Sequence, residues 1–207
     1  MSWKGKKKRL KDIWQRFSGH GIYPYELAFL LDNPLRKFII SPKKFVQYLH
    51  LNKDSKVLEI GSGPGYFSLE VAGIIHNGFL VLFDIQIEML QRCSKKLGKN
   101  NIHNVFLAQG NAQSLPFNSN TFEVVYLVTV LGEVANPKNC LESICRIIRD
   151  GGILSITEMK CDPDILSFDQ VNKMAGESGF EFLEKFSTRK GITYNFIRKD
   201  PSSYVNT

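Results

Sequence analysis

Three glycines at alternate positions, Gly61, Gly63 and Gly65, are the residues of this chain whose spacing says most about its chemistry. Glycine has no Cβ, so a loop built from it lets backbone N–H groups approach a ligand closely. The loop follows the apolar run 57–60 and precedes a stretch typical of a helix, whose N-terminus also offers unpaired N–H groups. The sequence therefore predicts a loop that binds polar or anionic groups of a ligand.

The spacing of the glycines and the positions of two acidic residues restrict the kind of ligand that the loop could bind. Dinucleotide-binding loops follow the pattern G-x-G-x-x-G, whereas this chain has G-x-G-x-G. Glu59 lies two positions before the first glycine, and Asp84 lies 23 positions after it, at the end of a second apolar run. A carboxylate at that place can accept hydrogen bonds from both ribose hydroxyls, and it can also cap the following helix. We predict a nucleoside-bearing cofactor without a pyrophosphate.

Apolar runs alternate with helical patterns from Lys56 onward, and these elements must position the loop. Strands are expected at 56–60, 79–83, 105–108, 122–128 and 153–158, and helices at 66–75, 88–97, 138–148 and 168–178. Short apolar strands between helices indicate a parallel sheet covered on both faces. The segments 180–187 and 192–198 predict a hairpin, which adds an antiparallel strand near one edge.

The N-terminal region is expected to be an addition to this sheet. Residues 1–50 would form a basic tail and accessory helices over 10–17, 25–31 and 42–49, residues 51–200 one compact domain, and residues 201–207 a tail. The segment 23–36 suits either a lid over a binding site or a helix that caps the sheet.

Composition excludes several classes of protein. A chain of 207 residues with 43% hydrophobic residues can bury a sizeable core. It has no apolar run of about eighteen residues, and its basic N-terminus lacks the apolar segment of a signal peptide. Its four cysteines, Cys93, Cys140, Cys145 and Cys161, show no metal-binding spacing. We expect reduced thiols, no metal and a cytoplasmic protein.

The net charge of +7 belongs mainly to the N-terminus. Residues 1–17 carry +6 and the rest of the chain only +1, which does not support a general nucleic-acid-binding face on the domain. Nucleic acid binding through residues 4–16 stays open as an alternative. The amphipathic, basic segment 3–17 could also touch a membrane surface, although packing against the domain is favoured.

With these observations assembled, the chain resembles the class I S-adenosylmethionine-dependent methyltransferases, particularly the type 11 group related to quinone-biosynthesis methyltransferases. The resemblance covers residues 24–200 and is carried by 57–68, 82–86, 109–117 and 122–137 followed by 146–152. Residues 109–117 are similar to the family's G-D-A-x-x-L-P-F, and 146–152 to its L-K-P-G-G turn. The resemblance implies an α/β, Rossmann-like doubly wound sheet of seven strands, mostly parallel, with a C-terminal antiparallel hairpin.

The resemblance also implies S-adenosylmethionine as the cofactor and assigns its contacts. Glu59 would help to hold the methionine end, Asp84 the ribose, and Ile85 and Met89 the adenine ring. The cofactor-binding residues implied are Glu59, Gly61, Ser62, Gly63, Gly65, Asp84, Ile85, Met89, Asn111 and Ala112. Several of these positions have ordinary structural interpretations as well: glycines in a tight turn, and Met89 in the core.

The chain departs from the family pattern at two places. Asn111 stands where the family usually has aspartate; it keeps a carbonyl acceptor for the adenine amine but loses charge. After the fourth strand, relatives often carry a histidine-containing pair, whereas this chain has Glu133 as its only ionisable residue there. Methyl transfer needs a general base only if the acceptor must lose a proton. The catalytic candidates are Glu133, Tyr25, Tyr66 and Tyr126.

The leading hypothesis is a methyltransferase that acts on a small molecule, because the compact domain has no added recognition module. The alternatives are a nucleic-acid or protein methyltransferase that uses the basic tail, and a catalytically silent protein that binds the same cofactor. Residues 128–131 lack the N-P-P-Y-type motif of base methylation, which disfavours amino groups of nucleic-acid bases. Nothing in the sequence identifies the acceptor or the oligomeric state.

Overall fold

The computed structural model describes residues 41–160, 162–188 and 190–199. In this part of the chain one seven-stranded sheet has the order β3-β2-β1-β4-β5-β7-β6. The strands are β1 (Lys56–Ile60), β2 (Phe79–Asp84), β3 (Val105–Gln109), β4 (Phe122–Val128), β5 (Ile148–Met159), β6 (Phe180–Ser187) and β7 (Gly191–Arg198). Strands β1 to β5 pair in parallel, whereas β7 is antiparallel to both β5 and β6. The predicted fold class is confirmed, including the C-terminal hairpin.

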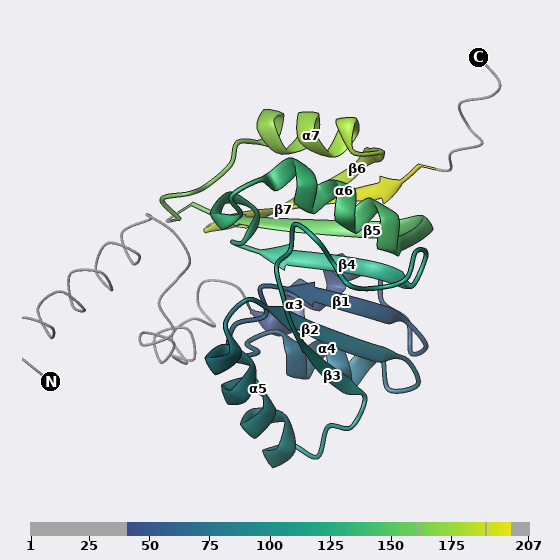
Figure 1. Ribbon diagram of the computed structural model, residues 1–207, viewed down its shortest axis with the longest axis vertical. Helices are drawn as coiled ribbons and strands as arrows, with labels where there is room; N and C mark the ends of the chain where they lie inside the picture. Colours follow the sequence, from purple (N-terminus) through teal and green to yellow (C-terminus); the bar gives the residue numbers. More distant parts are fainter. Residues whose placement is uncertain (1–40, 161, 189, 200–207) are drawn as a thin grey trace, which may run out of the picture.

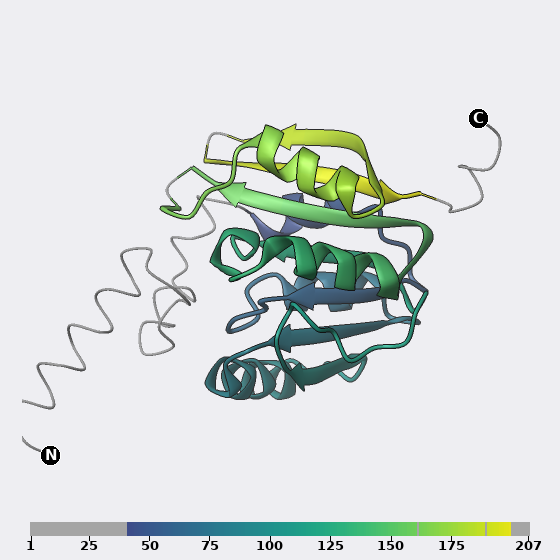
Figure 2. The same ribbon diagram turned by 45° about the horizontal axis from the view of Figure 1, so that its top comes forward.

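Helices cover both faces of the sheet (Figure 1). They are α3 (Pro42–Phe45), the 3₁₀ turn η3 (Val46–Leu49), α4 (Ser68–Ile74), α5 (Ile87–Lys99), the 3₁₀ turn η4 (Leu131–Glu133), α6 (Pro137–Ile147) and α7 (Phe168–Glu177). The α6 and α7 helices share a buried cluster with one face, and α3, η3, α4 and α5 share another with the opposite face. The turned view shows α5 and the β6–β7 hairpin at opposite ends of the sheet (Figure 2).

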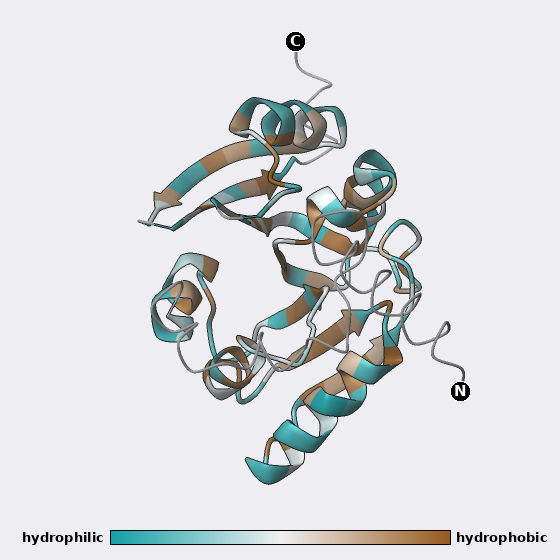
Figure 3. Cartoon of the chain, turned by 90° about the vertical axis from the view of Figure 1, so that its left-hand side faces the viewer, coloured by the Kyte–Doolittle hydropathy of each residue, from teal (hydrophilic) through white to brown (hydrophobic). Residues whose placement is uncertain are grey.

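Local sequence explains where these helices begin and which side they bury. Helix α6 begins at Pro137 after Asn136, whose side chain accepts from the backbone N–H of Asn139 at 3.1 Å. Helix α7 begins with a capping box formed by Ser167 and Gln170. In Figure 3 many residues of the strands are hydrophobic, whereas the helices carry both hydrophobic and hydrophilic residues. This is expected when each helix buries one side.

Several boundaries differ from those predicted, and three of the differences have a structural cause. Strand β5 begins at Ile148 rather than 153, because Ile148 pairs with Phe122 ahead of an irregularity in the β4–β5 register. Helix α4 begins at Ser68 rather than 66, because the glycine loop continues through turns. The predicted helix over 42–49 is split into α3 and η3, and His50 ends it with a left-handed φ of 49°. The predicted helices over 10–17 and 25–31, and the segment 23–36, lie outside the described residues.

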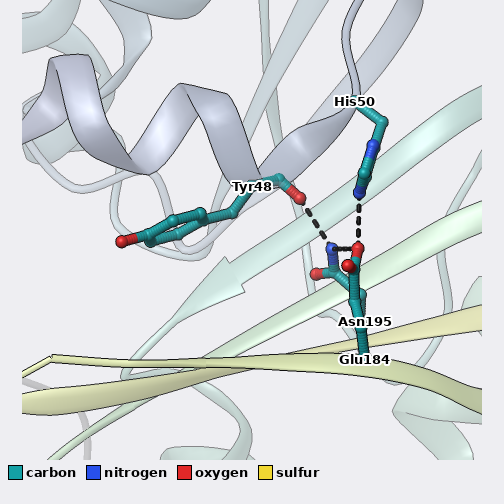
Figure 4. Close-up of polar contacts among 4 residues, drawn as sticks. All are labelled: Tyr48, His50, Glu184 and Asn195. Atoms are coloured by element: carbon teal, nitrogen blue, oxygen red, sulfur yellow. Dashed lines mark hydrogen bonds and ion pairs between the residues drawn. The ribbon is translucent and has the colours of Figure 1, made fainter.

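A polar junction fastens η3 to the antiparallel hairpin (Figure 4). The buried Asn195 side chain on β7 donates from Nδ2 to the Tyr48 carbonyl oxygen at 2.6 Å and to Glu184 Oε1 at 3.2 Å. His50 Nε2 pairs with the same Glu184 oxygen. The Tyr48 ring stacks on Phe186, with centroids 4.3 Å apart. The junction thus ties the first described segment of the chain to the last two strands.

The described residues bear on two expectations from composition, reduced cysteines and the absence of a membrane-spanning helix. Cys93, Cys140 and Cys145 are free thiols, and Cys161 lies outside the described residues. Among the helices of the described ranges, none is both long and apolar enough to cross a membrane.

Candidate active site

The glycine loop is held by backbone groups at the end of β2. Gly61, Gly63 and Gly65 have φ angles of 68°, 53° and 74°, a region that favours glycine. The Gly61 N–H donates to the Phe83 carbonyl at 2.8 Å, and the Gly63 N–H donates to Asp84 Oδ2 at 2.8 Å. The loop is therefore shaped by its glycines and fixed to the neighbouring strand.

A cavity of about 500 Å³ opens beside this loop, at the carboxyl ends of β1, β2 and β4. The strand order reverses between β1 and β4, which is where open α/β sheets bind ligands. The predicted residues that line the cavity are Glu59, Gly61, Ser62, Gly63, Asp84, Ile85, Met89, Asn111 and Ala112, together with the catalytic candidates Tyr66 and Glu133.

Three predicted residues do not line this cavity. Gly65 packs against α5: a Cβ placed on it would lie 2.4 Å from Cys93 Sγ. Tyr126 is fully buried in β4, beside Glu59 in the β1–β4 register, and its hydroxyl lies near that carboxylate. Tyr25 lies outside the described residues.

Glu59 is a buried carboxylate on the floor of the cavity, with 4% of its surface exposed. Ser68, at the start of α4, donates its hydroxyl to Glu59 Oε2 at 2.6 Å. Burial raises the pKa of Glu59 to about 7, although the Ser68 hydrogen bond and Lys96 favour the charged form. A nearby cation on a ligand would therefore stabilise the carboxylate.

Asp84 ends β2 and faces the cavity with 7% of its surface exposed. Its Oδ1 accepts from the Gln86 N–H and its Oδ2 from the Gly63 N–H, both at 2.8 Å. Burial raises the pKa of Asp84 above its ordinary value, while these N–H groups favour the charged form. Each carboxylate oxygen has a second lone pair, so the group can also accept hydrogen bonds from a ligand.

The residues expected to contact a nucleobase lie along one side of the cavity. Ile85 is 43% exposed, whereas Met89, on α5, is buried. Asn111 is exposed, and its Oδ1 already accepts from the Gln113 N–H at 3.0 Å and from Gln113 Nε2 at 3.2 Å. Gln113 therefore orients the Asn111 amide.

The other side of the cavity is mainly apolar and comes from the last residue of β4 and the segment after it. It contains Val128, Thr129, Val130, Glu133, Val134 and Ala135, which we call the β4 wall. Thr129 has a left-handed φ of 54°, and its N–H donates to the Thr157 carbonyl at 2.9 Å. The β4 wall lies close to the loop, because a Cβ on Gly61 would lie 2.3 Å from Val130 Cγ2.

Sequence reasoning missed several residues around the cavity. Gln86, Phe83 and Gln113 line it beside predicted neighbours, and most of the β4 wall was not singled out. Their nearness in sequence to Asp84, Asn111 and Glu133 was the available signal. Lys96 contacts the loop from α5, and its position in the sequence, far from these motifs, gave no indication of that contact.

Comparisons with known proteins identify the family. Residues 51–189 match the model of the methyltransferase domain family. Over 182 residues the chain is 31% identical to the ubiquinone/menaquinone biosynthesis C-methyltransferase UbiE of Wigglesworthia glossinidia brevipalpis, covering 82% of this chain and 70% of that protein.

Solved structures show the same fold. A SAM-dependent methyltransferase from Aquifex aeolicus superposes with a TM-score of 0.80 at 19% identity, over 85% of this chain and 99% of that one. The [4+2]-cyclase SpnF superposes with a TM-score of 0.71 at 15% identity, over 76% and 80% of the two chains. The chain belongs to the class I S-adenosylmethionine-dependent methyltransferases, and S-adenosylmethionine is its cofactor.

The cavity residues fit this cofactor. Ser62 lines the cavity, and its buried hydroxyl has no hydrogen-bond partner among the described residues. A buried polar atom without a partner is costly, and a polar ligand group would remove that cost. Glu59 adds a negative charge for a cationic ligand, and Asp84 adds acceptors for a diol.

Proposed function

We propose that this methyltransferase acts on a carbon atom of a small organic acceptor that bears an ionisable hydroxyl group. The observation that carries the proposal is the β4 wall, which presents apolar side chains and the carboxylate of Glu133 to the cavity. Apolar walls suit a hydrophobic ring, and the carboxylate suits a hydroxyl proton. The relatives named as C-methyltransferases support carbon as the target atom.

The cofactor would be held along the loop side of the cavity. Asp84 would accept the ribose hydroxyls, Ile85 and Met89 would contact the adenine ring, and Asn111 with the Ala112 N–H would meet its edge. Glu59 and Ser62 would hold the methionine end. When bound, S-adenosylmethionine supplies a methyl group made electrophilic by a positively charged sulfur.

The side chains of the β4 wall would prepare the acceptor. Glu133 would take the hydroxyl proton on a carboxylate oxygen, which makes the ring carbons next to the oxygen more nucleophilic. Val130 and Val134 would exclude water and keep the ring in one orientation. Tyr66 also lines the cavity and is a second hydrogen-bonding group for the acceptor.

The test is transfer of a labelled methyl group from S-adenosylmethionine to a panel of phenols and hydroquinones, with RNA and protein as parallel substrates. We expect label in a small molecule. Glu133→Gln should lower kcat by about a hundredfold and leave the affinity for S-adenosylmethionine unchanged. Glu142→Gln, an exposed carboxylate on α6, is the matched control.

Other outcomes would favour the alternatives. Label found only in RNA or protein would support the hypothesis that the basic residues 4–16 recruit a macromolecule. Binding of S-adenosylmethionine without transfer to any member of the panel would favour a silent binding protein.

A further inference from the structure

Lys96 supports the second half of the glycine loop from outside the cavity. It lies on α5, and its Nζ donates to the Gly65 carbonyl at 3.2 Å and to the Pro64 carbonyl at 3.5 Å. Cys93, one turn earlier on α5, packs its sulfur against Gly65. Thus α5 holds the part of the loop that β2 does not.

These contacts hold carbonyl groups rather than side chains. Backbone carbonyls in a folded protein need partners, and a hydrogen bond from a charged donor is stronger than one from a neutral donor. The Gly65 N–H donates to the Ser62 carbonyl at 3.0 Å, so the position of Gly65 fixes Ser62 as well. Ser62 lines the cavity, and a contact on the outer side of the loop therefore affects the inner side.

The same ammonium group acts on Glu59. Burial, the largest effect, raises the pKa of Glu59, and the charge of Asp84 raises it further, whereas Lys96 lowers it. The hydroxyls of Ser68 and Tyr126 also face this carboxylate and favour its charged form. Among these neighbours Lys96 is the cation.

We propose that Lys96 is a positioning residue for S-adenosylmethionine binding, which holds the glycine loop in its binding shape and places a positive charge beside Glu59. Lys96 is not among the residues that line the cavity, so it acts through the loop and through Glu59. The inference rests on the proposed role of these two features in holding the cofactor.

The test compares affinities for S-adenosylmethionine, measured by calorimetry on the full chain between pH 6.5 and 8.5. Lys96→Met should weaken binding by about tenfold at pH 7.5, the loss expected for a charged hydrogen bond. Lys96→Arg keeps the charge and the donors and should restore affinity to within about threefold. Lys95→Met, an exposed neighbour on the same helix, should bind like the wild type.

The pH dependence separates positioning from general destabilisation. Without the Lys96 charge the pKa of Glu59 rises, so the carboxylate ionises at higher pH. The deficit of Lys96→Gln, which keeps amide donors, should therefore shrink as the pH is raised from 6.5 to 8.5. A thermal melt of each unliganded variant reports stability separately.

Two results would overturn the inference. One is equal affinity for Lys96→Met and Lys95→Met at every pH; the other is a deficit that is constant with pH and follows the loss of melting temperature. A wild-type chain that does not bind S-adenosylmethionine would refute the cofactor site itself, and is thereby distinguished from a failure confined to Lys96.

Discussion

The two sides of the cavity are built in different ways. On the loop side, Gly61 and Gly63 donate backbone N–H groups to β2, and the polar residues Glu59 and Asp84 have defined partners. On the other side, half of the β4 wall residues are valines, and the wall runs from the last residue of β4 past a short 3₁₀ turn. The difference shows why the cofactor is easier to recognise than the acceptor: hydrogen-bonded polar groups need particular residues at particular positions, whereas an apolar wall accepts many.

The largest expected effect comes from the contact between the two sides. Gly61→Ala adds a Cβ at a positive φ and 2.3 Å from Val130 Cγ2, so both the loop and the β4 wall must shift. A left-handed alanine and an overpacked contact together should lower the free energy of unfolding by about 4 kcal/mol, and S-adenosylmethionine binding should weaken at least about tenfold. Denaturant unfolding and calorimetry measure these two changes.

Gly73→Ala is the matched control for this substitution. Gly73 lies inside α4, and a Cβ there has no atom within 4 Å. It should raise the free energy of unfolding by about 0.5–1 kcal/mol, because alanine favours the helix. Unchanged cofactor affinity in Gly61→Ala would mean that the loop and the β4 wall move independently.

A second, intermediate effect depends on pH and compares Glu59, a buried acid in the cavity, with a buried acid that does not line the cavity. The pKa of Glu59 is raised to about 7, so its contribution to stability is complete below the ordinary value of 4.5 and is lost as the pH rises through 7. Relative to Glu59→Gln, the unliganded wild type should lose about 3 kcal/mol between pH 4.5 and 8. Denaturant unfolding at several pH values measures the difference.

Glu158, at the end of β5, provides the comparison. It is buried, its Oε1 has no hydrogen-bond partner among the described residues, and burial with the charge of Asp162 raises its pKa to about 8. The loss relative to Glu158→Gln should therefore continue to higher pH than the loss relative to Glu59→Gln. Parallel curves for the wild type and both variants would show that neither acid is held protonated.

The smallest effect is expected at the junction in Figure 4. His50 and Glu184 are partly exposed, and exposed ion pairs contribute little to stability. His50→Ala should lower the free energy of unfolding by less than about 1 kcal/mol and leave cofactor affinity unchanged. A large change in affinity would show that η3 and the hairpin influence the cavity.

Most strands could be predicted because each is a short apolar run between helices. The limits of β1 and β4 are those expected from 56–60 and 122–128, and the hairpin differs by one residue. The early start of β5 could not be predicted, because it depends on the pairing of Ile148 with Phe122 across the sheet. The irregularity is a property of two strands together and not of either sequence alone.

The residues of the site could likewise be predicted only where the local sequence determines their position. Placement of Glu59, Asp84 and the loop at one cavity follows from motifs, since each lies at a strand end. The contact of Lys96 with Gly65 and the burial of Tyr126 beside Glu59 depend on packing between elements distant in sequence. The cofactor contacts and the role of Glu133 stay predictions.

The left-handed turn at Thr129 has a practical consequence for protein engineering. It lets the chain leave β4 and reach α6 through a segment of only a few residues, while the sheet on either side is fixed by strand pairing. Residues 133–135 can therefore be varied as a cassette, whereas Leu131 must be kept because it is fully buried in the core. If the β4 wall binds the acceptor as proposed, libraries confined to that cassette would change the acceptor and keep the methyl donor. Gly132 would be retained, because a Cβ there would meet the Asp164 carbonyl oxygen at 2.0 Å.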